Sequence, residues 1–182
     1  MGDEPTQISE ERARAAVALI LRGASTSRDI LFIKRARNPR DPWSGHMAFP
    51  GGRWETDDPS LLHTAMRETL EEVGLDLSSG SGPVEELSPL LPSSPQLPPL
   101  HIQPYVFEVG RETEPILDSG EVAAVHWVGL DALRDPSNQS TVEFTYHGAT
   151  RNFPCFRVIP GEVVWGLTYR IVTEFLSAPS RR

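Results

Sequence analysis

Three glutamates recur at helical spacing near the middle of the chain: Glu68, Glu71 and Glu72. Side chains three and four positions apart are neighbours on a helix, so these carboxylates would gather in one small region. Like charges placed this way repel each other unless a cation lies between them, and Mg²⁺ and Mn²⁺ prefer oxygen ligands of this kind. We therefore expect Mg²⁺ or Mn²⁺ at these glutamates. A solvated acidic face is the alternative interpretation.

The segment around the glutamates is predicted to be a helix. Asp58 suits the N-cap position and Pro59 the first helical position, where the missing N–H costs nothing. Gly74 supplies a C-terminal stop. The residues expected on the buried side share the helical period: Leu62, Met66, Thr69 and Val73.

The run from Gly52 to Leu75 resembles the Nudix box, G-x5-E-x7-R-E-U-x-E-E-x-G-U, in which U is apolar. Its second half matches at Arg67, Glu68, Glu71, Glu72, Gly74 and Leu75. The first half differs, because five residues lead from Gly52 to Asp58 instead of Glu, and eight residues instead of seven precede Arg67. The box is one residue longer, which leaves the role of Asp57 or Asp58 open.

A basic loop precedes the box and carries Arg35, Arg37 and Arg40. Arginine offers a planar fork of donors that suits phosphate, although ordinary surface charge would give the same pattern. The run from Arg35 to Gly52 resembles R-S-x3-R-x3-G-x3-F-P-G-G, the upstream motif of the coenzyme A pyrophosphatase branch of Nudix enzymes. Ala36 replaces the Ser, and four residues instead of three follow Arg40. The lengthened box is also a feature of that branch.

The resemblance implies an α/β fold, the Nudix α/β/α sandwich with a mixed β-sheet. We expect it over residues 15–178, between an N-terminal tail (1–14) and a C-terminal tail (179–182). The other elements follow from apolar patterning and turn residues. They are strands at 15–21, 30–33, 84–90, 101–109, 122–128, 141–146 and 153–159, a short helical turn at 130–133 and a helix at 162–176. The resemblance implies that the helix at 162–176 lies on the face opposite the box helix. The proline-rich run 91–104 is expected to be a structured loop near the site instead of a linker between two domains.

The resemblance also implies roles for single residues. Metal ligands would be Glu68, Glu71, Glu72 and the main chain of Gly52. Arg67 would orient a box carboxylate by a charge-assisted hydrogen bond. Arg35, Arg37, Arg40 and Arg53 would bind substrate. A further catalytic carboxylate is expected before the strand at 122–128, where Glu121 is preferred to Glu112, Glu114 and Asp118. Which carboxylate accepts the proton stays open.

The function implied is divalent-metal-dependent hydrolysis of a nucleoside diphosphate-linked substrate. The preferred substrate is coenzyme A or acyl-CoA, split into 3′,5′-ADP and (acyl-)4′-phosphopantetheine. One alternative is a Nudix pyrophosphatase acting on ADP-ribose, another nucleoside diphosphate derivative or a nucleoside triphosphate. Another is a nucleotide-binding domain without turnover.

Composition narrows the class of protein. The chain has 182 residues, 38% of them hydrophobic, which suits one domain with a real core. Its net charge of −8 argues against nucleic acid as the main partner. The single cysteine, Cys155, rules out an internal disulfide framework and is expected to be a small buried residue. The polar N-terminus and the lack of a membrane-length apolar run favour a cytoplasmic protein, with a homodimer possible.

Zinc and serine chemistry find no support in the sequence. The five histidines share no metal-ligand spacing, and no G-x-S-x-G segment occurs.

Overall fold

The computed structural model describes residues 13–24, 27–39, 41, 43–80, 82–91, 100–117, 119–146 and 149–177. Arg40, Asp118, most of the proline-rich run and nearly all of the two expected tails lie outside the described residues. Within the described part, seven strands form one mixed sheet. They are β1 (Ala13–Ala24), β2 (Ser27–Arg35), β3 (Met47–Ala48), β4 (Gly51–Arg53), β5 (Glu85–Glu86), β6 (Leu100–Val109) and β7 (Val122–Gly129).

Strand β1 lies at the centre of this sheet. It pairs with β6 in parallel, and with β2 and β4 antiparallel. Beyond these, β2 pairs with β3 and β7, and β6 with β5. The strands expected at 15–21, 30–33, 101–109 and 122–128 are confirmed, with slightly longer bounds, while the one expected at 84–90 shrinks to Glu85–Glu86 and a single bridge from Leu90 to Ile102.

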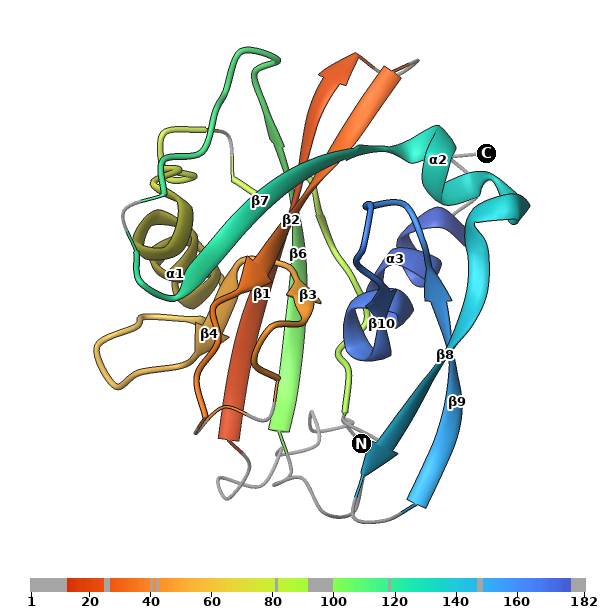
Figure 1. The fold of residues 1–182 in the computed structure, drawn as a ribbon. Coiled ribbons are helices and arrows are strands. Elements are labelled where there is room, and N and C mark those ends of the chain that lie inside the picture. Colours follow the sequence, from red (N-terminus) through yellow and green to blue (C-terminus); the bar gives the residue numbers. More distant parts are fainter. Residues whose placement is uncertain are drawn as a thin grey trace, which may run out of the picture.

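Side chains of β1 alternate between two apolar cores, because successive residues of a strand point to opposite faces. Ala18 and Ile20 belong to the core under helix α1 (Leu61–Val73). Leu19 and Leu21 belong to the core under helices α2 (Leu130–Arg134) and α3 (Gly166–Ser177). Figure 1 shows α1 on one side of the sheet and α3 on the other, so the predicted α/β/α sandwich is confirmed.

A second, smaller sheet follows α2 and the short 3-10 helix η1 (Pro136–Asn138). It consists of β8 (Gln139–Tyr146), β9 (Ala149–Phe156) and β10 (Val164–Trp165), with β9 in the middle. Two contacts attach it and α3 to the main sheet beside β3. Lys34 forms an ion pair with Glu162, and the hydroxyl of Thr168 donates to the carbonyl of Met47 at 3.2 Å.

The predicted N-cap of the box helix is wrong. Ser60 caps α1 by accepting from the N–H of His63. The carboxylate of Asp58 accepts instead from the hydroxyl of Thr64 at 2.9 Å and from Arg67. An Asp-Pro pair two residues upstream looks equally suitable in the sequence, but a buried partner on the helix holds Asp58 away from the helix end.

The buried side of α1 also differs from the prediction. Thr69 and Val73 are buried as expected, but Leu62 and Met66 are only half-buried. Thr64, Ala65 and Glu72 are buried in addition. The helix is therefore turned so that a glutamate, and not only apolar residues, faces the sheet.

The last helix begins later than predicted. Val164 and Trp165 pair with Phe156 and Cys155 of β9, so they form a strand. Gly166, at φ +64, makes the left-handed turn from which α3 continues. The strand expected at 153–159 correspondingly ends at Phe156, while Cys155 is fully buried as predicted.

Candidate active site

The glycine pair of β4 lies directly against the carboxylates of α1. The N–H of Gly51 donates to Oε2 of Glu72 at 2.9 Å. A Cβ placed on Gly52 would fall 2.2 Å from Oε1 of Glu68. Only a residue without a side chain lets the main chain approach this closely. The sequence Gly51-Gly52 therefore brings the two glutamates against the backbone of β4.

Arg67 connects the loop before α1 to two of the glutamates. Its Nε and Nη2 donate to the two carboxylate oxygens of Asp58 at 2.9 and 3.0 Å. Its Nη1 donates to Glu68 and to Glu71, at 3.1 Å in both cases. Nη2 also donates to the carbonyl of Arg53 at 3.2 Å. The guanidinium thus orients the carboxylates of Glu68 and Glu71, and Asp58 anchors the guanidinium.

Glu72 and Glu68 carry their charge in an environment that disfavours it. The side chain of Glu72 is 3% exposed, and burial raises its pKa to about 7, against the opposing effects of the Gly51 N–H and Arg35. Burial likewise raises the pKa of Glu68, with Arg67 opposing. Glu71 differs, because its side chain is 57% exposed. A cation at this point would relieve the cost of burying two carboxylates side by side.

Arg35 approaches the same cluster from β2. It donates to Asp41 from Nε and Nη2, at 3.0 and 2.8 Å. Its Nη1 lies 3.9 Å from Oε1 of Glu72. The side chains of Arg37 and Arg53 are exposed, so among the described members of the predicted substrate-binding set Arg35 is the one whose side chain is partly buried beside Glu72 of the box helix.

Glu121 is the residue directly before β7. Its charge contributes to the raised pKa of both Glu68 and Glu72. Its carbonyl accepts from the N–H of Ala36 at 2.7 Å, which fixes it next to the basic loop. Glu114 instead forms an ion pair with Arg22 at 2.7 Å. Of the described competitors for the further carboxylate, Glu121 is the one whose charge acts on the box.

Carboxylate and main-chain oxygens are the donors that a hard divalent ion prefers. In the described part of the chain, no three or more Asp, Glu, His or Cys side chains are gathered closely enough to hold a metal ion by themselves. Mg²⁺ and Mn²⁺ sites of this type use a few carboxylates and take their remaining oxygens from water and substrate phosphates. The oxygens predicted for such an ion are those of Glu68, Glu71, Glu72 and the main chain of Gly52.

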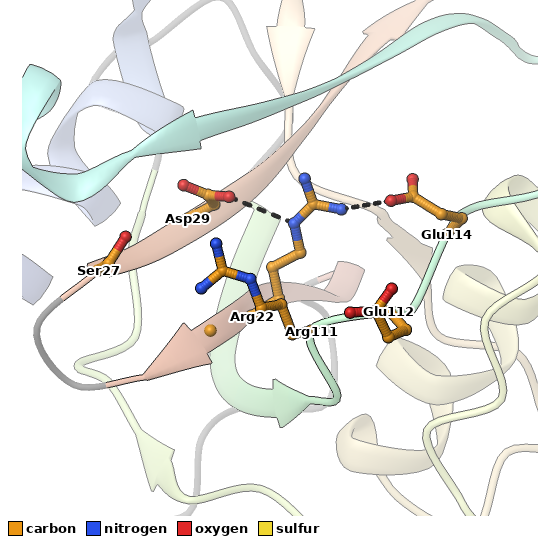
Figure 2. Close-up of a pocket in the computed structure, with 7 residues that line it drawn as sticks. Arg22, Ser27, Asp29, Arg111, Glu112 and Glu114 are labelled. Carbon is orange, nitrogen blue, oxygen red and sulfur yellow. Dashed lines mark hydrogen bonds and ion pairs between the residues drawn. The ribbon is translucent and has the colours of Figure 1, made fainter.

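A separate pocket of about 160 Å³ lies at the far end of β1 and β2 (Figure 2). Arg22 fills its centre, donating to Asp29 at 3.3 Å and to Glu114 at 2.7 Å. The guanidinium also lies 4.1 Å from the ring centre of Trp127. Because these partners already engage Arg22 and none of the box residues lines the pocket, we do not assign the reaction to it.

Comparison with known proteins agrees with this geometry. Residues 11–147 match the family described as NUDIX domain. The chain belongs to the Nudix hydrolase family. Members of this family are pyrophosphohydrolases acting on nucleoside diphosphate derivatives, and they generally need divalent metal ions.

Several relatives of this Nudix chain are known by sequence. It is 32% identical to the human mitochondrial coenzyme A diphosphatase NUDT8 over 170 residues, which cover 90% of this chain and 69% of that protein. The mouse protein of the same name is 31% identical, with 90% and 77% covered. An uncharacterized protein of Schizosaccharomyces pombe, C14C4.10c, is 36% identical over 63% of this chain, but the match spans only 36% of that longer protein.

Solved structures support the Nudix fold. A MutT/nudix family protein from Enterococcus faecalis aligns with a TM-score of 0.61 at 16% identity, covering 94% of this chain and 64% of that one. The NUDIX domain of Shewanella oneidensis NrtR, complexed with ADP ribose, aligns with a TM-score of 0.54 at 19% identity, covering 74% and 84%. Among the described helices of our Nudix chain, none is long and apolar enough to cross a membrane.

Sequence reasoning missed two members of the site of this Nudix chain. Asp41, whose carboxylate accepts from Arg35, lies in a turn-like run before Pro42 and was not predicted as a site residue. Thr64, which holds Asp58, sits in a helix where its burial could not be foreseen. An acidic residue six positions after Arg35, in an otherwise basic loop, was the available signal for Asp41.

Proposed function

We propose that this chain hydrolyses the diphosphate of coenzyme A or an acyl-CoA. The observation that carries the proposal is Arg35, held between Asp41 and Glu72 beside the box helix. Arg35 opens the segment that resembles the coenzyme A branch, so the feature that suggests the substrate also lies next to the carboxylates. Similarity to NUDT8 over 90% of the chain supports the same substrate class.

The reaction is the addition of water across a phosphoric anhydride. One P–O bond breaks, and the products are 3′,5′-ADP and (acyl-)4′-phosphopantetheine. Bound Mg²⁺ or Mn²⁺ would neutralise the diphosphate oxygens and lower the pKa of an attacking water. Glu68, Glu71, Glu72 and the Gly52 carbonyl would hold the ion.

The residues around this centre have distinct tasks. Arg67 orients Glu68 and Glu71, and Asp58 orients Arg67. Arg35 offers a cation to the diphosphate at the edge of the carboxylate cluster. Glu121 adds a further carboxylate, whose charge acts on Glu68 and Glu72, and would assist the metal or the attacking water. Arg37, Arg40 and Arg53 would supply further positive charge to the anionic substrate.

A second candidate is hydrolysis of ADP-ribose or another nucleoside diphosphate derivative. This candidate is supported by the two departures from the coenzyme A branch motif, at Ala36 and in the spacing after Arg40. Both candidates use the same carboxylates and differ only in what lies beyond the diphosphate.

A turnover screen separates the candidates. Purified protein is incubated with Mg²⁺ or Mn²⁺ and with coenzyme A, acetyl-CoA, 3′-dephospho-CoA, ADP-ribose and ATP. We expect the highest kcat/KM for coenzyme A or acetyl-CoA, and no turnover after chelation of the metal. A higher kcat/KM for ADP-ribose would replace the first proposal with the second. Absence of turnover on every substrate, with nucleotide binding retained, would indicate a binding domain.

The cytoplasmic location and the homodimer also belong to the proposal. Cell fractionation tests the first and light scattering of the purified protein the second.

A further inference from the structure

The small sheet carries an aromatic surface that the hydrolysis of a diphosphate does not use. Phe144 of β8, Phe153 of β9 and Trp165 of β10 come from its three strands. The rings of Phe144 and Trp165 are stacked, with centroids 3.8 Å apart and an interplanar angle of 18°. Phe153 lies 5.3 Å from Trp165. All three are only half-buried, so the cluster leaves part of its apolar surface open to solvent.

The strand register shows that these rings share one face of the sheet. Phe144 is opposite Arg151, Val142 is opposite Phe153, and Trp165 is opposite Cys155. Opposed residues of antiparallel strands point to the same side, and positions two apart do as well. The other face of the outer hairpin carries exposed polar residues such as Glu143 and Thr145. One face therefore carries the three rings, half-buried, together with the exposed Arg151, and the other face is polar.

This aromatic face lies next to the candidate active site. His46 places its ring 5.1 Å from Trp165 and 5.6 Å from Phe144, edge-on to both. The carbonyl of His46 accepts from the N–H of Arg35 at 3.0 Å, and Arg35 reaches to Glu72. One residue thus separates the aromatic rings from the arginine that we assign to the diphosphate. Lys34, the neighbour of Arg35, also forms an ion pair with Glu162, two residues before β10.

Charge favours a nucleotide as the occupant. Arg151 lies opposite Phe144 on the same face, and no ion pair involves Arg151 in the described part of the chain. A cation beside aromatic rings suits a base that carries phosphorylated ribose, whereas an uncharged acyl or pantetheine arm would gain nothing from it. Flat rings already stacked at 3.8 Å offer the geometry on which a further π-system stacks.

We propose that Phe144, Phe153 and Trp165, with His46 at their edge, form the nucleobase subsite, in which the adenine of the substrate stacks against the ring of Phe144. The inference rests on the proposed function for its choice of adenine, because coenzyme A and ADP-ribose both contain this base. It assigns substrate recognition to the small sheet and leaves the hydrolysis to the box helix.

The test measures binding of product fragments, so that it does not depend on turnover. Affinities for AMP, adenosine 3′,5′-bisphosphate and 4′-phosphopantetheine are determined by calorimetry for the wild type and for Phe144→Leu. Leucine keeps an apolar side chain but has no π face. We expect both adenine nucleotides to bind about 10-fold more weakly to the variant, and 4′-phosphopantetheine to bind as before.

A matched control lies on the opposite face of the same strand. Glu143→Gln should leave all three affinities unchanged, and thermal unfolding should show that both variants are folded at the temperature of the binding measurements. Binding of AMP should also quench the fluorescence of Trp165, an effect that Trp165→Phe should remove.

The possible results separate the two proposals. Unchanged affinity of both adenine nucleotides in Phe144→Leu would overturn the subsite, even if coenzyme A is hydrolysed. Weaker binding of 4′-phosphopantetheine alone would overturn it as well, and would assign the face to the other half of coenzyme A. Weaker adenine binding in a protein that prefers ADP-ribose would retain the subsite and contradict only the proposed substrate.

Discussion

Asp58 and Arg67 form a two-point ion pair in which both carboxylate oxygens accept from the guanidinium, at 2.9 and 3.0 Å. The sequence places Asp58 where the box motif has a glutamate, with one extra residue before Arg67. The shorter side chain of Asp58 still reaches Arg67, although the segment between them is one residue longer than in the motif. It also leaves Nη1 of Arg67 free to contact Glu68 and Glu71.

Replacing Asp58 with Asn should destabilise the protein by about 1.5–3 kcal/mol at pH 7, because a buried charged hydrogen bond is lost. Arg67 holds the pKa of Asp58 well below its usual value of 3.8. A lowered carboxyl pKa contributes stability that is present above 3.8 and is lost as the pH falls further. The difference between wild type and variant in urea unfolding should therefore narrow between pH 7 and pH 3. Asp57→Asn, at an exposed neighbouring position, is the control, and an equal loss there would contradict the assignment.

Replacing Glu72 with Gln should stabilise the metal-free protein at pH 8. A raised carboxyl pKa gives stability that is fully present below 4.5 and is lost as the pH rises through about 7. The wild type should lose on the order of 3 kcal/mol relative to the variant over this range. Thermal unfolding in chelator at pH 5 and pH 8 measures the effect. If the stability of the two proteins depended equally on pH, the carboxyl group of Glu72 would not have a raised pKa in the folded state.

With metal bound, the wild type should become more stable than Glu72→Gln at pH 8. A ligand that binds only the folded state raises the stability of that state, so Mg²⁺ or Mn²⁺ should raise the Tm of the wild type. The Tm of Glu72→Gln should respond much less. An identical response of the two proteins would place the ion elsewhere.

Replacing Glu71 with Gln should remove activity and leave stability nearly intact. The side chain is 57% exposed, so the change in the free energy of unfolding should stay within about 0.5 kcal/mol. Loss of one ligand charge should lower kcat/KM about 100-fold or more at low metal concentration. A metal titration of the rate should show partial recovery at high Mn²⁺. Near-normal turnover at low metal would remove Glu71 from the ligand set.

Replacing Gly52 with Ala should displace Glu68, because the added Cβ would lie within 2.6 Å of three atoms of its carboxyl group. A misplaced ligand should reduce kcat about 100-fold. The cost in stability should be about 1–3 kcal/mol. Gly80→Ala is the control, since the nearest atom to its added Cβ is 3.9 Å away. Full activity of Gly52→Ala would show that the close contact has no catalytic purpose.

Arg35 and Arg37 should affect substrate choice differently. Arg35 already contacts Asp41 and approaches Glu72, so Arg35→Ala should lower kcat/KM for coenzyme A and 3′-dephospho-CoA alike. The loss should correspond to about 1.5–3 kcal/mol of transition-state stabilisation for each substrate. Arg37 is exposed and is the better candidate for the 3′-phosphate. Arg37→Ala should narrow the preference for coenzyme A over its 3′-dephospho form. If Arg35→Ala narrowed the preference and Arg37→Ala lowered both kcat/KM values alike, Arg35 would bind the 3′-phosphate and Arg37 the diphosphate.

The sequence predicted the elements whose signal is local. The alternation in residues 101–109 and 122–128 gave strands close to β6 and β7, and the glutamate spacing gave the box helix. What it could not give were features decided by distant partners. The burial of Glu72 depends on Gly51, which lies 21 residues earlier in the chain. The separate sheet of β8, β9 and β10 depends on Trp165 pairing with Cys155, where a helical period had been expected.

The parallel pairing of β1 with β6 also bears on how the chain is made. All ten register pairs, from Ala13 with Leu100 to Arg22 with Val109, are separated by 87 residues. At about 5–20 residues per second, translation leaves one edge of the apolar strand β1 without its partner for roughly 4 to 17 seconds. Such long-range pairing folds slowly and exposes the chain to aggregation meanwhile. Production of this protein should therefore depend on chaperones that cover β1 until β6 emerges from the ribosome.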